Sequence, residues 1–350
     1  MPKTHITWPA RTEVPLPLAW LGMMTAAPHP VPDHSRSAVA FGMVTAVMVG
    51  VLTATQSRVN GELGRALGDG YLGAGLSFGS GLVILLIALA LWAPGRRGLA
   101  AAFGSVRAGA TPWWYLCGGA GGALFVLAQG LTGAVLGVAL FTVAVVSGQT
   151  LSGLAVDRNG IGTTPPAAIT VTRLVGSTLA LVAVVVAVSA GFGGDIPAWM
   201  LLFPFAAGLA VGLQQAVNGQ LRRVAGSAMT ATFMNFLVGT TVLLVACIIH
   251  ESIVGLPSRL PADPLLYLGG LIGVVFIGGA VLAVRVTGVL LLGLGSVAGQ
   301  LVMSLVLDVA LPVPGHSVVA STVVGTLLTL VAVGIAALPS RAIRRRVTAR

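Results

Sequence analysis

Long stretches without a charged residue constrain this chain more than any other feature of its sequence. Only 8% of the residues are charged, whereas soluble domains are roughly 25% charged. A membrane-spanning helix needs about 20 mainly apolar residues, and nine charge-free segments of the sequence reach about this length. One of them, 108–156, is long enough for two helices, and QGLTG (129–133) is the predicted turn between them. The sequence therefore predicts an all-α polytopic membrane protein with ten transmembrane helices. Asp, Glu, Lys and Arg do not occur in 37–57, 70–95, 108–156, 174–194, 196–221, 224–250, 264–284, 286–307 and 309–340.

The basic residues predict the orientation of these helices. With ten spans both termini share one side, and fifteen of the 19 Lys and Arg residues fall there, against three on the other side. Loops rich in Lys and Arg stay in the cytosol, so we expect a multi-pass protein of the plasma or inner membrane with both termini cytosolic. The net charge of +10 is thus an orientation signal. No soluble basic face is present that would predict nucleic-acid binding.

The ends of the chain differ in composition from the apolar body. Residues 1–36 hold seven prolines and are predicted to be a disordered cytosolic tail. Residues 341–350 form a short basic tail. The apolar body between them divides into two halves of five predicted spans each, 37–190 and 196–340.

The two halves repeat each other. VNGELGRALG (59–68) returns as VNGQLRRVAG (217–226), 158 residues later. Further matches at the same offset pair Gln56 with Gln214, Ser77 with Asn235, Phe78 with Phe236 and Gly81 with Gly239. The offset then becomes 152 for Tyr115, Gly118 and Gly121 (Tyr267, Gly270, Gly273) and 151 for Gly137, Gly148, Gln149 and Asp157 (Gly288, Gly299, Gln300, Asp308).

An odd number of spans in each half means that the second half enters the membrane upside down. The charges near the repeated motif differ between the two copies in the way that this inversion predicts. Arg58 and Arg65 alternate with acids in the first copy, whereas Arg222 and Arg223 have no acid beside them. Inverted repeats of this kind place a binding site near the bilayer midplane, at the interface of the repeats, and permit alternating access.

These motifs resemble the drug/metabolite transporter (DMT) superfamily, and within it the YdcZ-like branch of inner-membrane exporters. The resemblance covers about residues 38–338 and rests on Gln-x3-Asn-Gly after the first helix of each half, with Gly-Gln and then Asp at the fourth. It implies a ten-helix DMT fold and small-solute transport, and export rests on it alone. The chain departs from the pattern at Gln129, which matches Val281, and in its Pro-rich N-terminal segment.

Polar residues inside apolar spans are the candidates for a substrate site. A buried amide costs roughly 1–3 kcal/mol unless it finds a partner, so in lipid it faces other helices or a wet cavity. We place the substrate site first at Gln149 and Gln300, with Ser152 and Ser304 about one turn away. The alternative is that they link helices. Gln56, Gln214, Ser77, Asn235 and Gln129 are further candidates.

Other repeated residues have a structural interpretation beside the functional one. Asn60-Gly61 and Asn218-Gly219 are expected to end a helix at each membrane face, with solute contact as the alternative. Gly148 and Gly299 would let a neighbouring backbone or a solute come close.

Two repeated acids are candidates for ion coupling. Asp157 and Asp308 lie eight residues after the glutamines, which is about 12 Å along a helix, and so near opposite membrane faces. Either could couple transport to protons, or simply be a solvated helix end.

The predicted function is that of a secondary transporter, an exporter of a small metabolite or drug-like compound, with a coupling ion as a further partner. No ATP-binding loop occurs, and we expect neither a cofactor nor a metal. The alternatives are a membrane scaffold or sensor and a membrane-embedded enzyme. An enzyme needs a paired nucleophile and base or a metal site, whereas the histidines (His5, His29, His34, His250 and His316) fall in predicted tails or loops.

Overall fold

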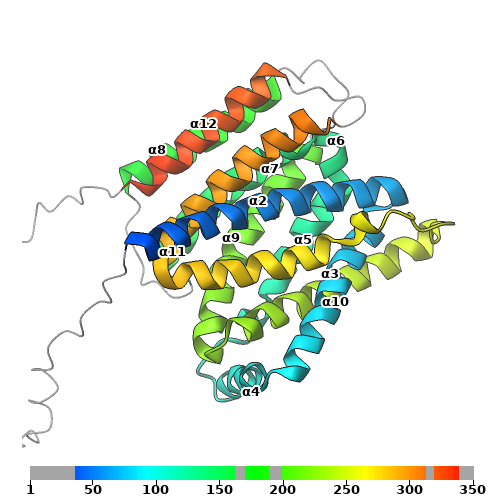
Figure 1. Cartoon of the computed structure of the whole chain (residues 1–350), viewed down its shortest axis with the longest axis vertical. Helices are drawn as coiled ribbons and strands as arrows, with labels where there is room; N and C mark the ends of the chain where they lie inside the picture. Colours follow the sequence, from blue (N-terminus) through cyan, green and yellow to red (C-terminus); the bar gives the residue numbers. More distant parts are fainter. Residues whose placement is uncertain (1–35, 162–169, 190–196, 198, 313–318, 339–350) are drawn as a thin grey trace, which may run out of the picture.

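A computed structural model describes residues 36–161, 170–189, 197, 199–312 and 319–338. For 36–39, 157, 188, 278, 281–291 and 337 it describes only the backbone. Every element in this part is helical, which confirms the all-α class. The predicted tails, 1–36 and 341–350, lie outside it except for Arg36. The elements are α2 (Arg36–Leu67), α3 (Gly70–Leu91), α4 (Ala93–Arg107), η1 (Trp113–Gly118), α5 (Gly119–Ala128), η2 (Gln129–Gly133), α6 (Ala134–Leu136), α7 (Val138–Asn159), α8 (Val171–Val188), α9 (Trp199–Ala225), α10 (Ala228–Val254), η4 (Pro264–Tyr267), α11 (Gly269–Ala310) and α12 (Ala320–Ala337) (Figure 1).

Seven segments of the described part are long and apolar enough to cross a membrane, and two apolar helices are shorter. The shorter ones are Val171–Ala187 and Ala320–Ala336, which pack side by side as α8 and α12 at one edge of the bundle (Figure 1). The seven are Ala40–Leu67, Gly70–Leu91, Trp113–Leu136, Val138–Val156, Trp199–Ala225, Ala228–Val254 and Leu292–Ala310.

Helix α11 consists of two arms that run in opposite directions. On a straight helix Gly279 and Ser296 would lie about 25 Å apart, yet they pack against Val49 and Gly50, which are neighbours on α2. Figure 1 shows the reversal at the left end of the yellow arm, where the orange arm begins. The first arm supplies the remaining predicted span, and a total of ten spans stays a prediction. Arg285, which separates the charge-free windows 264–284 and 286–307, lies where only the backbone is described.

The predicted turn at 129–133 is wrong. These residues form the π-helical segment η2, which continues α5, and four of them (Gln129, Gly130, Thr132 and Gly133) are buried. The chain reverses later, at Gly137, whose φ of 75° is a left-handed conformation that glycine adopts without strain. QGLTG has the composition of a turn, but its small residues serve close packing instead: Gly130 lies directly against Gly64 and Gly70.

The predicted helix ends at Asn60-Gly61 and Asn218-Gly219 are also wrong. Both motifs lie inside helices, since α2 continues to Leu67 and α9 to Ala225. The helices end at Gly68 (φ 67°) and Gly226 (φ 61°), the last residues of the same ten-residue repeat. Left-handed glycine is a common C-terminal cap. The repeat therefore does contain the residue that ends each helix, but this residue is the glycine eight positions after the asparagine.

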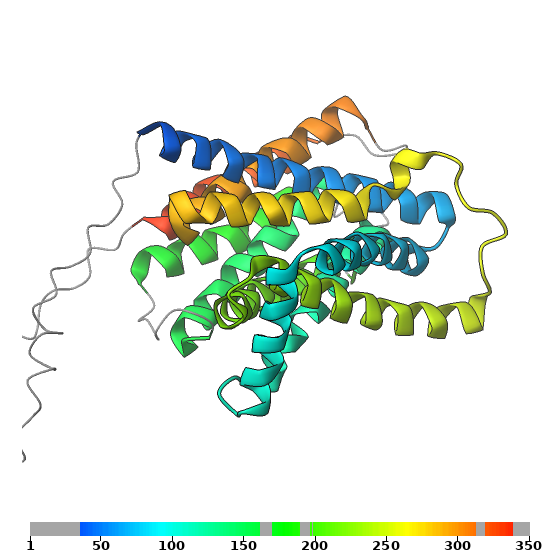
Figure 2. The same ribbon diagram turned by 60° about the horizontal axis from the view of Figure 1, so that its bottom comes forward.

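Helix α4 follows the second span and was not predicted. Figure 2 shows it crossing the direction of the bundle rather than joining it. Its inner side, with Gly95, Gly98 and Ala102, is buried, and its other side carries Arg96, Arg97 and Arg107. Amphipathic helices rich in arginine lie in the membrane interface. This helix occupies the longer connection of the first repeat, where the repeat offset falls from 158 to 151 residues.

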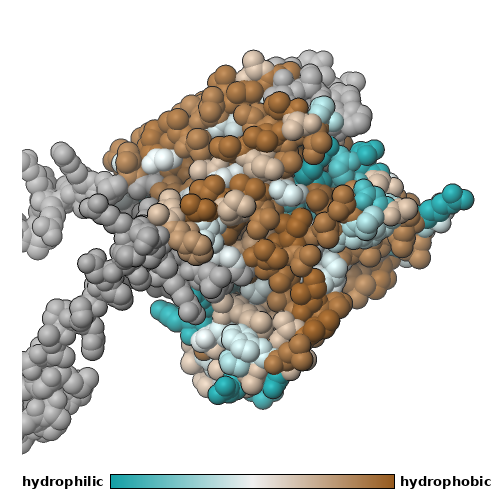
Figure 3. All heavy atoms as spheres, viewed as in Figure 1, coloured by the Kyte–Doolittle hydropathy of each residue, from teal (hydrophilic) through white to brown (hydrophobic). Residues whose placement is uncertain are grey.

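The surface of the bundle is apolar over most of its area. Phe41, Ile87, Ile248 and Leu202 are more than half exposed. Figure 3 shows a broad hydrophobic face with hydrophilic atoms gathered around α4 and at the opposite, right-hand edge. An exposed apolar surface of this extent is typical of a membrane interaction.

Glycines bring the two repeats into close contact at equivalent places. A Cβ on Gly148 of α7 would overlap the carbonyl oxygen of Phe205 on α9, and one on Gly299 of α11 would overlap that of Val47 on α2. Phe205 follows Val47 by 158 residues and Gly299 follows Gly148 by 151. Each contact thus joins one repeat to the other, and the second contact is the first with the roles of the two repeats reversed. This is the pattern of a two-fold symmetric interface.

The fifth helices obey the same symmetry. Gly176 of α8 faces the Ala332 carbonyl of α12, and Gly325 of α12 faces that of Ala183 on α8. Gly325 follows Gly176 by 149 residues, and Ala332 follows Ala183 by the same number. The repeat therefore extends to the last described helix.

Candidate functional site

Three amide side chains from α9 and α10 form one polar group, which we call the second amide cluster: Gln214, Asn218 and Asn235. Asn235 is buried at 5% exposure. Its Oδ1 accepts hydrogen bonds from Gln214 Nε2 at 2.7 Å and from Asn218 Nδ2 at 3.0 Å. Gln214 and Asn218 are four residues apart and so lie on one face of α9.

The first amide cluster lies in the first repeat. It contains Gln56, Asn60 and Ser77, which are equivalent to the members of the second cluster, together with Ser57 and Gln129. Asn60 donates to Gln129 Oε1 at 2.7 Å, and Gln129 Nε2 donates to Ser57 Oγ at 2.8 Å. Gln56 donates to the carbonyl of Gly269 at 2.8 Å. All five are buried. Gln129 is matched by an apolar residue in the second repeat, so this cluster has one amide that the second lacks.

Each cluster packs on glycines of the opposite repeat. A Cβ on Gly118 would lie 2.6 Å from Asn218 Oδ1, and one on Gly273 would lie 2.7 Å from Gln56 Nε2. Gly269 leaves no space for a Cβ beside Asn60 and Ser77. The third span of each repeat thus closes over the amides of the other.

These contacts correct the repeat register predicted for the third span. The sequence matched Gly118 with Gly270 at an offset of 152. In the structure Gly118 takes the place that Gly269 takes in the other repeat, and Gly119 and Gly122 correspond to Gly270 and Gly273. The offset is therefore 151 in both the third and the fourth span, which matches Gln129 with Ala280 rather than Val281. The runs GGAGG and GGLIG allow either alignment by identity, and only the contacts decide.

Two equivalent phenylalanines lie between the clusters. The rings of Phe78 and Phe236 stack with centroids 4.8 Å apart, and both are buried. Phe78 packs against Gly239 and Phe236 against Gly81, which are themselves equivalent. Gly122 lies next to Phe78 and Gln214, and Gly273 lies next to Phe236 and Gln56. The pseudo-two-fold axis thus passes through the stacked pair, with one amide cluster on either side.

Several amide and hydroxyl atoms of these clusters are buried without a hydrogen-bond partner among the described residues. They are Asn60 Oδ1, Ser77 Oγ and Gln214 Oε1, and Gln300 Nε2 is in the same state. An unsatisfied buried polar atom costs roughly 1–3 kcal/mol. Four of the twelve such atoms in the described part of the chain thus belong to residues that the sequence had singled out.

Gln149 and Gln300, the first candidates from the sequence, lie at the two glycine crossings rather than in the amide clusters. Gln300 is buried at 4% exposure and follows the crossing of α11 with α2. Gln149 is half-buried. Ser152 lies against Gly212 on α9, and Ser304 donates to Leu301 O within its own helix at 2.8 Å. The described contacts do not bring the two glutamines together.

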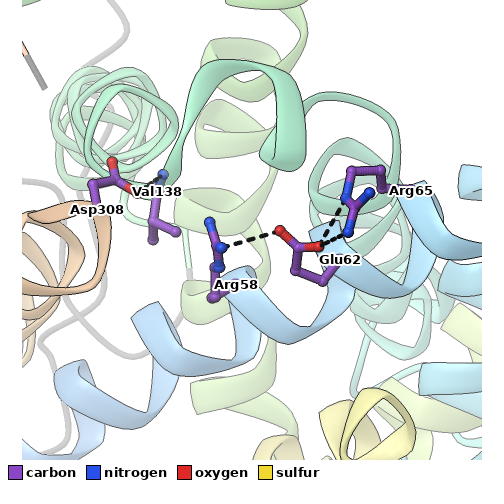
Figure 4. Close-up of polar contacts among 5 residues, drawn as sticks. All are labelled: Arg58, Glu62, Arg65, Val138 and Asp308. Carbon is purple, nitrogen blue, oxygen red and sulfur yellow. Dashed lines mark hydrogen bonds and ion pairs between the residues drawn. The ribbon is translucent and has the colours of Figure 1, made fainter. Parts of the chain in front are cut away.

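Asp308, a coupling candidate, stabilises a helix start. Its carboxylate accepts hydrogen bonds from Val138 N at 2.8 Å and Ala139 N at 2.7 Å, and Figure 4 shows it pointing at the first turn of α7. A carboxylate at a helix N-terminus is favoured by the unpaired N–H groups and the helix dipole. A Cβ on Gly137 would lie 2.9 Å from this carboxylate. The side chain of Asp157 lies outside the described residues.

An ion-pair group lies at the end of α2 on the predicted outer face. Glu62 binds Arg58 at 3.1 Å and Arg65 at 2.7 Å, and Figure 4 shows it between the two arginines. Both pairs are local contacts on one helix, three or four residues apart. Three of the alternating charges noted in the sequence, Arg58, Glu62 and Arg65, are therefore paired on one helix.

Sequence reasoning missed Ser57 and the role of the two phenylalanines. The matched pair Phe78 and Phe236 was visible in the repeat, and an identical aromatic at the same place in both copies is what a residue on the symmetry axis requires. Ser57 gave no such signal, because its counterpart at the offset of 158 is a different residue, Gln215.

Comparisons with known proteins agree with the division into two repeats. The model of the family described as "Putative inner membrane exporter, YdcZ" matches residues 41–186 and again 199–335. No functionally curated protein matches the sequence. Among solved structures, one described only as the crystal structure of a protein is similar with a TM-score of 0.50 and 20% identity, over 86% of this chain and 97% of that one. This likeness concerns the fold.

Proposed function

The chain belongs to the YdcZ family of the DMT class, which makes it a membrane transporter, and from this premise we propose that it exports a small polar solute by alternating access. The solute binds at the interface of the two repeats, between the two amide clusters. The observation that supports this site most is the set of buried, unpartnered polar atoms on Asn60, Ser77 and Gln214.

The chemistry of the clusters indicates the class of solute. Amides and hydroxyls offer both donors and acceptors without a net charge. An uncharged or zwitterionic solute with several polar groups could satisfy Asn60 Oδ1 and Ser77 Oγ on one side and Gln214 Oε1 on the other. A solute that lacks these groups would leave the buried atoms unpaired, which is how a polar site discriminates between ligands.

The stacked phenylalanines suggest how access alternates. Phe78 and Phe236 belong to α3 and α10, which cross at the pseudo-two-fold axis. Rocking of one repeat against the other around this contact would open one face and close the other. Orientation with both termini cytosolic and the direction of transport are part of the same proposal.

The test is a ligand-dependent thermal shift of the detergent-purified protein across a library of polar metabolites and drug-like compounds, followed by flux of each ligand into proteoliposomes. Asn235→Ala removes the acceptor that two amides share. Thr241→Ala is the matched control on the same helix, because the Thr241 hydroxyl donates to the Leu237 carbonyl one turn earlier in that helix.

We expect ligands that stabilise the wild type and Thr241→Ala but not Asn235→Ala, and that cross the membrane. A ligand that both variants bind equally would move the site away from the second amide cluster. Saturable binding without flux would contradict transport of that ligand and favour the scaffold or sensor alternative.

A further inference from the structure

A group of three potential metal ligands lies at the predicted outer face, where α3 begins and α10 ends. Asp69, His250 and Glu251 each offer one ligand atom, and these atoms lie within 4.8 Å of one another. The predicted loop position of His250 is wrong, because this residue lies inside α10, in its last turns. Because Glu251 follows it directly and Asp69 caps the neighbouring helix, all three side chains meet across the α3–α10 contact.

The positions of Asp69 and His250 are fixed by other contacts. Asp69 Oδ1 accepts hydrogen bonds from Tyr71 N at 2.8 Å and Leu72 N at 3.1 Å, and the His250 ring stacks on Tyr71 with centroids 4.4 Å apart. His250 Nε2 and Asp69 Oδ1 are 3.8 Å apart. That is too long for a hydrogen bond. Two nitrogen or oxygen ligands of a tetrahedral zinc ion lie about 3.4 Å apart, so the two atoms would approach by a few tenths of an ångström to share one.

Glu251 supplies an independent indication. Both of its carboxyl oxygens are shielded from solvent and accept no hydrogen bond from the described residues. A carboxylate in this state is costly unless a cation or donor reaches it. The group therefore contains a carboxyl group whose two oxygens receive no hydrogen bond from the described residues.

We propose that Asp69, His250 and Glu251 form a binding site for a divalent transition-metal ion, with zinc as its probe, that clamps the outer ends of α3 and α10 together. One imidazole and two carboxylates are a ligand set that zinc accepts, with a fourth position left for water. An imidazole favours zinc-like ions over magnesium and calcium, which prefer oxygen ligands.

The site belongs to one face of the membrane only. The positions equivalent to Asp69, His250 and Glu251 at an offset of 158 are Ser227, Trp92 and Ala93. Ser227 still caps its helix, by accepting from Thr230 N, so the capping function is repeated while the ligands are not. An ion on the outer side would thus restrain α3 and α10 at one end of their crossing and leave the other end free. This inference is independent of which solute is transported.

The experiment is a titration of the purified full-length chain, without a histidine tag and stripped with a chelator, with Zn²⁺ by isothermal titration calorimetry. His250→Gln and Glu251→Gln remove one ligand each at similar size. Glu62→Gln is the control, since it removes a carboxylate at the same face that is bound to Arg58 and Arg65 instead. Size-exclusion profiles and unfolding temperatures in chelator show whether each variant is folded.

We expect one zinc ion per wild-type chain, unchanged binding in Glu62→Gln, and a loss of affinity of about 100-fold or more in the other two variants, since even changes outside the ligand shell cost 10–100-fold. A tenfold excess of Mg²⁺ or Ca²⁺ should not displace zinc. Absence of saturable zinc binding to the wild type, or equal binding by all four proteins, would overturn the proposal.

Should the two ligand variants fail to fold, Co²⁺ binding to the wild type decides. Visible absorption bands of a four-coordinate cobalt site that zinc removes support the proposal, and a spectrum of hydrated cobalt alone contradicts it.

Discussion

Substitution of Gly50 by alanine tests the close crossing of α2 with the second arm of α11. A Cβ at Gly50 would lie 2.6 Å from Gln300 N and 2.8 Å from Ser296 C, and it would overlap the Ser296 carbonyl oxygen. Real Cβ contacts almost never fall below 3.0 Å. All three atoms are backbone, so no side chain can rotate away and the two helices must separate.

The cost follows from this geometry. Overpacking of a close contact costs typically 1–3 kcal/mol, and a rigid backbone partner places Gly50→Ala in the upper part of that range. Alanine also gains up to about 1 kcal/mol of helix propensity over glycine. The control Gly153→Ala, in α7, has no atom within 4 Å of its new Cβ and shares only the propensity gain. The difference between the two variants therefore isolates the clash, at about 1–3 kcal/mol.

The assay is reversible unfolding of the purified protein in mixed detergent micelles, with the free energy of unfolding compared among wild type, Gly50→Ala and Gly153→Ala. Gly208→Ala should match Gly50→Ala, because its Cβ would overlap the Val145 carbonyl in the equivalent crossing. Equal stability of Gly50→Ala and Gly153→Ala would refute the reasoning, and a large cost at only one of the two crossings would refute the symmetry.

Three further substitutions test single interactions. Asp308→Asn keeps the size of the side chain but cannot accept both N–H groups of α7, so the unfolding free energy should fall by about 1–3 kcal/mol; retention of full stability would contradict its role as a cap. Gly137→Ala should destabilise more than Gly68→Ala, because both have positive φ but only Gly137 has the Asp308 carboxylate 2.9 Å from a new Cβ; thermal melts of the pair decide. The pKa of Asp69 lies below its ordinary value, so its stabilisation is complete above the unfolded pKa and is lost as the pH falls through the lower folded value. Asp69→Asn keeps an oxygen that can accept from Tyr71 N and Leu72 N but has no charge to favour the helix N-terminus. In chelator it should therefore be less stable than wild type at neutral pH, by about 0.3–1 kcal/mol, and the gap should close on acidification; a gap that stays constant from neutral to strongly acidic pH would contradict this.

Much of the architecture follows from the sequence alone. Charge-free windows predict membrane helices, because lipid offers no partner to a charge or to an open backbone. Repetition of Val-Asn-Gly and of Gly-Gln at long offsets predicts two related halves, since each half must present the same surface to the other. Even the glycines that end α2 and α9 are within the quoted repeat, at Gly68 and Gly226.

Other features depend on contacts that no local pattern encodes. QGLTG has the composition of a turn, yet it is a buried π-helical segment, because Gly130 packs against Gly64 and Gly70 from two other helices. Asn60-Gly61 resembles a helix end, yet α2 continues, because Asn60 finds Gln129 as a partner 69 residues away. Propensity and composition are weak where a distant segment supplies the hydrogen bond or the packing surface.

The candidate site divides in the same way. Sequence alone determined which polar residues are repeated within apolar spans, and with them nearly all members of the two amide clusters. Only the tertiary structure decided how they are grouped: it joined Gln214 and Asn218 to Asn235, separated Gln149 from Gln300, and placed Phe78 on Phe236. The physical reason is that a repeat fixes equivalent positions along the chain, whereas the crossing of helices from opposite halves fixes which of those positions meet.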